Sequence, residues 1–213
     1  MQGVAKSAFP SRFPFYGLHT IAQHCTLGDV RVMYSLLKRD SVRGGRASKA
    51  LLPVRPVATM NTMDEARLME EVSRMLEDDG DRQRKAAGIA GAIRRVGGYR
   101  WVGLYEVTEE EIINLAFDGP GAPTHPRFSV TQGLSGSAVA SGKTVVVGDV
   151  SKDPRYLTAF GSTRSEIIIP VLDRTRRKVV GTIDVESDRV DAFSEEDRAA
   201  LERCAAAVAG IFV

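Results

Sequence analysis

The stretch SEIIIPVLDRTRRKVVGTIDVES, residues 165–187, decides the fold. Two apolar runs rich in β-branched residues, 165–173 and 178–187, flank the charged turn RTRR. Apolar runs bounded by a polar turn predict two neighbouring strands. Because these are the most apolar strands that the sequence predicts, we expect them to lie centrally in a sheet.

Shorter strand-like runs precede this pair. YRWVGLYEV (99–107), EIINLAF (111–117) and HPRFSV (125–130) contain β-branched or aromatic residues and are separated by polar or Gly/Pro-rich breaks. They predict consecutive antiparallel strands. GLSGSAVASGK (133–143) is too rich in small residues for a packed strand and predicts a short helix or turn across the sheet. TVVVGDV (144–150) then returns to extended structure.

Amphipathic helices are predicted on both sides of the strands. Apolar residues recur at helical spacing from Leu68 to Leu76 and from Ala86 to Ile93, and Gly97–Gly98 ends the second helix. A last helix begins at Ser194, with Asp197 as its capping-box partner. Its apolar stripe consists of Leu201, Cys204, Ala205, Val208 and Phe212.

This order of elements predicts an α+β domain with an antiparallel sheet of about five to six strands and N- and C-terminal helices on one face. The other face is left to form a pocket. We divide the chain into three parts: a disordered or wrongly assigned N-terminal extension (1–59), N-terminal helices (60–96) and the folded domain (97–213). The extension is predicted because residues 1–59 show no sustained hydrophobic period.

Composition excludes several classes of function. The 29 basic and 27 acidic residues give a net charge of +2, which does not predict nucleic-acid binding. No apolar run approaches the roughly 18 residues of a membrane span, so we expect a cytoplasmic protein without membrane contact. The two cysteines, Cys25 and Cys204, suit neither a disulfide framework nor a thiolate metal site, and we expect no metal and no cofactor.

Four motifs follow one another in the order typical of GAF domains: residues 133–156 (GLSGSAVASGKTVVVGDVSKDPRY), SEIIIPV, VVGTIDVES and residues 193–202 (FSEEDRAALE). Residues 99–213 therefore resemble this family of sensory domains, whose fold is of the GAF/PAS type. A narrower resemblance, on WVGLY (101–105), SEIIIP and TIDVES, is to the free methionine-(R)-sulfoxide reductases. Both resemblances imply a site for a small molecule.

The reductase resemblance implies which residues form that site. In those enzymes a Trp and a Tyr pack the substrate, and acidic residues on two strands hold its amino group. Asp184 and Glu186 are two positions apart on a strand, so they share a face toward Glu166, and carboxylates beside aromatic rings suit a small cation. The expected ligand-binding residues are Trp101, Tyr105, Ser135, Glu166, Asp184 and Glu186.

The chemistry of the reductases depends on cysteines that attack the sulfoxide and form a disulfide. The resemblance places the attacking cysteine at Ala159 and the other two at Ser135 and His125, none of which is a cysteine. Cys204 is expected to be inert in the core. We therefore predict a non-catalytic, small-molecule-binding GAF domain that signals through a partner or as a homodimer. The alternative is a divergent methionine-(R)-sulfoxide reductase.

Structural interpretations remain open for each site residue. Trp101 and Tyr105 alternate on a strand, as any aromatic pair in a core does. Glu166 could form a surface ion pair with Arg164 or Arg174. The remaining alternatives are a cap for Ser135, at the short helix, and a hydrogen bond to a turn for the strand-end carboxyl of Glu186.

Overall fold

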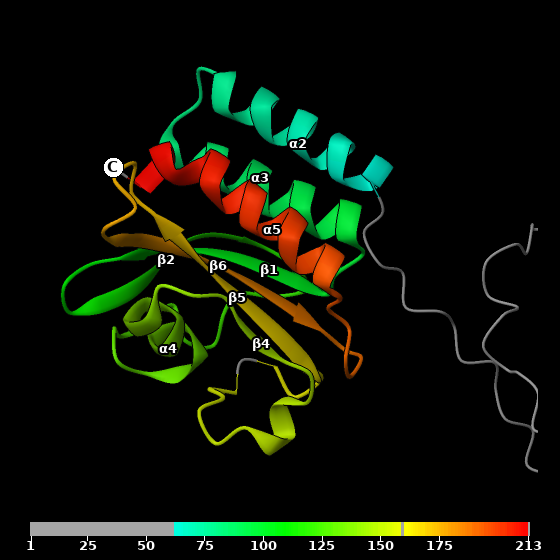
Figure 1. Ribbon diagram of the computed structural model, residues 1–213, viewed down its shortest axis with the longest axis vertical. Coiled ribbons are helices and arrows are strands. Elements are labelled where there is room, and N and C mark those ends of the chain that lie inside the picture. The colour runs from blue at the N-terminus through cyan, green and yellow to red at the C-terminus, as the bar shows by residue number, and fades with distance from the viewer. Residues whose placement is uncertain (1–61, 159, 213) are drawn as a thin grey trace, which may run out of the picture. The chain divides into compact units, whose positions relative to one another are not determined.

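The computed structural model describes residues 62–158 and 160–212. Its centre is a six-stranded antiparallel sheet with the strand order β3-β2-β1-β6-β5-β4 (Figure 1). The strands are β1 Trp101–Val107, β2 Glu111–Asp118, β3 Arg127–Ser129, β4 Val145–Val147, β5 Ser165–Leu172 and β6 Val179–Ser187. The predicted α+β class is therefore confirmed. The predicted extension, residues 1–59, lies outside the described residues.

Helices cover the sheet unequally. Helices α2 (Thr62–Glu77), α3 (Arg82–Gly97) and α5 (Glu195–Val208) lie together on one side of the sheet, with α2 outermost (Figure 1). Helix α4 (Gly133–Ser141) lies on the other side, as predicted for a cross-sheet element. The short 3-10 helices η1 (Val150–Lys152) and η2 (Ala209–Phe212) follow β4 and α5.

The hairpin that decides the fold forms as predicted. Strands β5 and β6 pair antiparallel from Ser165↔Ser187 to Leu172↔Val179. Strand β6 is central, and all its residues are buried. Strand β5 is second from the edge, because the three-residue strand β4 pairs with its outer side. A strand that is buried on both faces carries few polar side chains, which explains the long apolar runs in the sequence of β5 and β6.

The core between the sheet and the helices uses the apolar stripes of the helices. Leu68 and Val72 of α2 are fully buried, together with Ile89 and Ile93 of α3. The predicted stripe of the last helix is also buried, although its last member, Phe212, lies in η2 rather than in α5. In the part of the chain that the structure describes, these stripes pack against the same chain. This packing therefore gives no support to a homodimer formed through the apolar faces of the helices. Dimerisation remains a prediction.

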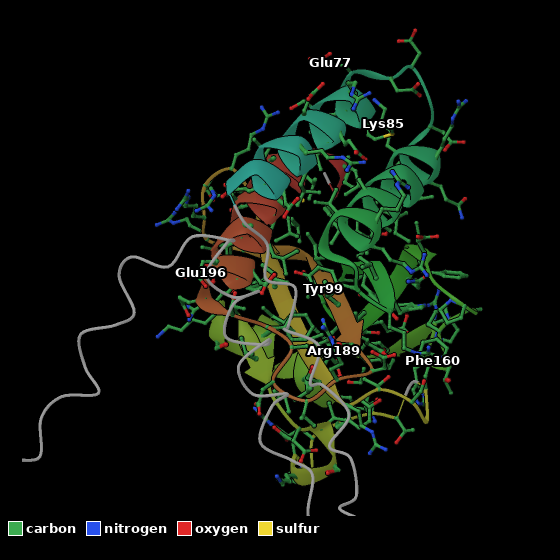
Figure 2. The ribbon with its side chains drawn as sticks, turned by 90° about the vertical axis from the view of Figure 1, so that its right-hand side faces the viewer. Glu77, Lys85, Tyr99, Phe160, Arg189 and Glu196 are labelled. Atoms are coloured by element: carbon green, nitrogen blue, oxygen red, sulfur yellow. The ribbon has the colours of Figure 1, made fainter. Side chains whose placement is uncertain are left out.

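Tyr99 and Asp197 join the start of the sheet to the last helix. Gly98 ends α3 in the left-handed conformation (φ 63°), and its N–H donates to the carbonyl of Arg94. The hydroxyl of Tyr99 then donates to Oδ1 of the buried Asp197 (2.8 Å), and Figure 2 shows Tyr99 on the helical side of the sheet. Asp197 also completes the predicted capping box with Ser194.

No helix within residues 62–158 and 160–212 is long and apolar enough to cross a membrane.

Replacing Ser194 by alanine should destabilise the domain. The Oγ of Ser194 accepts the N–H of Asp197 (3.1 Å) and donates to its carboxylate (2.7 Å). Ser194→Ala removes both of these hydroxyl bonds and leaves the bond from the backbone N–H of residue 194 to Asp197 (2.9 Å). We expect the free energy of unfolding to fall by about 1 kcal/mol in urea denaturation. Ser73→Ala, at an exposed position of α2, is the control and should cause no loss. Equal stability of Ser194→Ala and wild type would contradict the role of this cap.

Candidate functional site

The strand register brings the predicted site residues onto one face of the sheet. Trp101 lies opposite Glu186, and Glu186 lies opposite Glu166. One pleat further along, Gly103 lies opposite Asp184. Directly paired residues of a sheet point to the same side. The face away from α2, α3 and α5 therefore carries the three carboxyl groups beside the aromatic residues of β1.

A small, partly open cavity lies over this face. Its lining consists of Tyr105, Pro123, His125, Phe128, Gly133, Leu134, Ser135, Leu157, Glu166, Asp184 and Glu186. The cavity volume is about 30 Å³, close to the volume of one water molecule in the liquid. Ligand sites usually measure roughly 300–1,000 Å³. The loop residues Pro123, His125 and Leu157 hold the site nearly closed.

Aromatic rings form one wall of the site. Trp101 stacks on Phe117 with centroids 6.1 Å apart and packs against Tyr105 and Phe160; Figure 2 labels Phe160 in the loop that covers this face. The indole Nε1 of Trp101 donates to the carbonyl of Gly121 (3.1 Å) and so holds the opposite loop. Trp101 is 1% exposed and lies beside the cavity rather than in its lining.

The carboxyls of Glu166 and Asp184 lie close enough to interact directly in the cavity. Neighbouring carboxyls in a buried site disfavour each other's charged form. Burial raises the pKa of both carboxyls well above the usual range, and the nearby Glu186 raises both further. One oxygen of each group, Oε2 of Glu166 and Oδ1 of Asp184, has no hydrogen-bond partner among the described residues.

Glu186 is held differently. The hydroxyl of Thr163 donates to its Oε2, while its Oε1 is buried without a partner among the described residues. Burial raises the pKa of Glu186 to about 7, against the opposing effects of the Thr163 hydrogen bond and of the positive charge of Arg100. The site thus contains a carboxyl that titrates near neutral pH.

Tyr105 contributes a ring and a hydroxyl to the same wall. Burial, and then the negative charges of Asp184, Glu186 and Glu166, raise its pKa far above the usual range. Its hydroxyl also forms a hydrogen bond with the side chain of Asn114. Tyr105 is therefore a neutral group at neutral pH and can donate or accept a hydrogen bond in the cavity.

The N-terminus of α4 forms the opposite wall. Gly133 begins this helix with a left-handed backbone (φ 73°). The cap residue Gln132 makes no side-chain capping bond, so the first N–H groups of α4 have no cap. Gly133, Leu134 and Ser135 all line the cavity. The first N–H groups of a helix carry a partial positive charge that favours an anionic group.

The structure decides between several sequence interpretations. A surface ion pair of Glu166 is wrong, because Glu166 is 7% exposed and faces the cavity. A capping role of Ser135 is also wrong, because Ser135 lies within α4 and Gln132 occupies the cap position. Glu186 accepts a hydrogen bond from the loop residue Thr163 and also lines the cavity, and its role in ligand binding remains a prediction.

The positions that match the reductase cysteines hold no thiol. His125 and Ser135 line the cavity, and Ala159 lies outside the described residues. Cys204 lies in the core between the helices and the sheet, on the other side of the sheet, and burial raises its pKa to about 12. A thiol with this pKa stays protonated at neutral pH and is a poor nucleophile.

Sequence reasoning missed the aliphatic and aromatic part of the lining. Phe128 packs its ring edge-on against Tyr105 at 5.9 Å, and Leu134 and Leu157 close the remaining sides. Phe128 follows β2 in an alternating strand pattern and could have been placed on this face. Leu157 lies in a loop, where the sequence carries no period that reveals its direction.

Among the described residues, no group of three or more His, Cys, Asp or Glu side chains is arranged to hold a metal ion. Asp149 and Asp153 instead accept hydrogen bonds from the backbone N–H groups of Ser151 and Arg155, as is typical of turn-forming aspartates.

The fold and the site agree with the similarity of the chain to known proteins. The GAF domain family matches residues 81–212, and the chain belongs to this family. It is 30% identical over 131 residues to GAF domain-containing protein A of Dictyostelium discoideum, which covers 61% of this chain and 80% of that protein.

Free methionine-R-sulfoxide reductases are also similar to this chain. The enzyme of Saccharomyces cerevisiae is 32% identical over 108 residues, which is 49% of this chain and 58% of the enzyme. The structure of the Neisseria meningitidis enzyme in complex with its substrate superposes with a TM-score of 0.62 and 28% identity, over 73% of this chain and 94% of that chain. The resemblance to this subgroup is confirmed.

Gly103 is required for the rings of Trp101 and Tyr105 to converge. A Cβ at this position would lie 2.2 Å from Cη2 of Trp101 and 2.8 Å from Cε2 of Tyr105. Gly103→Ala should therefore lower the free energy of unfolding by about 1–3 kcal/mol and shift the emission of Trp101, the single tryptophan. Gly161→Ala, where a Cβ meets nothing within 4 Å, is the control. An unchanged emission spectrum of Gly103→Ala would contradict this packing.

The raised pKa of Glu186 should make stability depend on pH. The ordinary pKa of this carboxyl is 4.5, and in the native state it is about 7. Between these two pH values the native state binds the proton more tightly than the unfolded state, so the free energy of unfolding falls as pH rises. One proton contributes a slope of about 1.4 kcal/mol per pH unit. Urea denaturation between pH 5 and 7.5 should give a shallower slope for Glu186→Gln than for wild type. The exposed Glu196→Gln should keep the wild-type slope, and identical slopes for all three proteins would refute the shift.

Proposed function

We propose that this GAF domain binds a small amino-acid-like molecule and carries out no thiol chemistry on it. The observation that carries the proposal is a set of three carboxyl oxygens, on Glu166, Asp184 and Glu186, that are buried in one cavity and have no hydrogen-bond partner within residues 62–158 and 160–212. Buried polar atoms are normally hydrogen-bonded. An ammonium group offers three donors and a positive charge, which suits this set.

The opposite wall supports the amino-acid character of the ligand. The uncapped start of α4 offers backbone N–H groups to a carboxylate or another anionic oxygen. Carboxyl groups on one side and a helix N-terminus on the other suit a molecule with both charges. Tyr105 and Phe128 leave an apolar wall for its side chain.

Entry of such a ligand requires the covering loops to move. A cavity of about 30 Å³ is too small for an amino acid, so the segments that carry His125 and Leu157 must shift outward. The bond from Trp101 to Gly121 (3.1 Å) connects one of these segments to β1. Binding should therefore change the environment of the single tryptophan.

The second candidate function is a divergent methionine-(R)-sulfoxide reductase, favoured by the similarity to the enzymes of Saccharomyces cerevisiae and Neisseria meningitidis. Reduction of a sulfoxide by a protein thiol forms a sulfenic acid or a disulfide. His125 and Ser135 supply no thiol, and Cys204 is buried on the far side of the sheet. We therefore favour binding over reduction.

The binding proposal is tested with methionine, methionine sulfoxide and N-acetylmethionine by thermal shift and calorimetry. The first two should raise the melting temperature, whereas N-acetylmethionine, which lacks the ammonium group, should not. Asp184→Asn should weaken binding at least tenfold, and Asp188→Asn, at an exposed position beyond β6, should not weaken it. Because an ammonium group favours the charged form of Glu186, whose pKa is raised to about 7, affinity should rise between pH 5.5 and 7.5.

Equal binding of N-acetylmethionine would refute the role of the carboxyl groups. The same preparations, incubated with free methionine-(R)-sulfoxide and dithiothreitol, should show no turnover above the blank. Turnover that survives in a Cys25→Ser, Cys204→Ser double variant would make the protein an enzyme and overturn the non-catalytic part of the proposal.

A further inference from the structure

A second and larger hollow lies at the outer side of α5, away from the carboxyl site. Its volume is about 650 Å³, within the range of sites that hold small molecules. It is bounded by α5, by the turn between α4 and β4, and by the β5–β6 hairpin. The two cavities share no lining residue.

Positive charge surrounds this hollow. Five basic residues line it, on three separate elements. Three of them, Lys143, Arg174 and Arg176, are exposed and form no side-chain hydrogen bond or ion pair within the described residues. The backbone of Arg176 adopts a left-handed conformation (φ 56°), which turns the hairpin there.

The acidic residues that line the hollow already accept hydrogen bonds from neighbouring residues. Asp173 accepts the N–H of Arg177 (2.9 Å) and the hydroxyl of Thr175 (2.9 Å) within the hairpin. Glu202 accepts the hydroxyl of Thr144 (2.6 Å) and Nε of Arg198 (2.9 Å). Among the described residues, Glu202 is paired with Arg198, and Asp173 is the one lining carboxylate without an ion pair. The three cations Lys143, Arg174 and Arg176 outnumber it, so the hollow keeps a net positive charge.

The floor of the hollow consists of apolar side chains, several of which are alanines. Ala205 and Ala206 of α5 and Ala209 of η2 line it together with Ile169 and Leu172 of β5. Alanine side chains are too short to fill the space between α5 and the hairpin, which keeps the hollow open. An apolar floor next to three cations suits an anion with an apolar body.

We propose that this hollow binds a small organic phosphate. Lys143, Arg174 and Arg176 hold the phosphate group, and the apolar body of the ligand lies over Ala206 and its neighbours. Three cations without ion pairs favour a dianion over a single carboxylate, and arginine matches the oxygens of a phosphate. The site is separate from the carboxyl cavity and adds a second ligand to the domain.

Hexyl phosphate and inorganic phosphate serve as probes, with binding followed by NMR chemical-shift titration of the full chain. Hexyl phosphate should bind more tightly than inorganic phosphate and shift the resonances of α5 and the hairpin. Lys143→Ala combined with Arg174→Ala should weaken both probes at least tenfold. Arg74→Ala combined with Arg84→Ala, which removes two exposed charges from α2 and α3, is the charge-matched control and should weaken them less than twofold.

Filling the floor gives an independent test. Ala206→Phe should weaken hexyl phosphate at least fivefold and leave inorganic phosphate nearly unchanged, because it occupies only the apolar part. Its neighbour Ala207, which is also exposed but lies outside the lining, is the matched position, and Ala207→Phe should have no effect. Equal weakening by the two charge variants, or equal affinity for the two probes, would overturn the proposal.

Discussion

Burial of three carboxyl groups in one small cavity is the constraint on which the site depends. An isolated buried carboxylate is strongly unfavourable, and three together repel one another. Burial favours the neutral form of Glu166 and Asp184 by raising the pKa of both carboxyls, and the Thr163 hydroxyl donates a hydrogen bond to Glu186. The oxygens that remain without partners make the cavity suited to a cationic group.

The domain tolerates these buried carboxyl groups because the packing that stabilises it lies on the other side of the sheet. The helical side of the sheet forms a dry core that includes Leu68, Ile93 and Leu201, and the Tyr99–Asp197 bond joins β1 to the capped start of α5. The two faces of β6 thus have different roles. Ile183 and Val185 pack under the helices, while Asp184 and Glu186 face the cavity. Alternation along one strand is what permits this division.

Membership of the GAF family and similarity to methionine sulfoxide reductases establish the fold and its relatives, but they do not decide the chemistry of this chain. The fold hosts many functions, and function depends on the side chains in the site. The acidic and aromatic residues expected from the reductase resemblance are present in this chain, and the positions expected to match the reductase thiols hold histidine, serine and alanine. On our proposals the domain recognises an amino-acid-like ligand in one cavity and a phosphate beside α5.

The sequence by itself determined the six strands, the capped last helix and the shared face of Asp184 and Glu186, because each depends on local periodicity or on spacing of a few residues. It did not determine that Glu166 is buried, that Ser135 lies inside α4, or that Leu157 closes the cavity. Nor did it reveal that cations from the α4–β4 turn and the β5–β6 hairpin surround one hollow. These facts depend on how segments far apart in the chain pack together. No local pattern in the sequence reveals which side chains such packing buries.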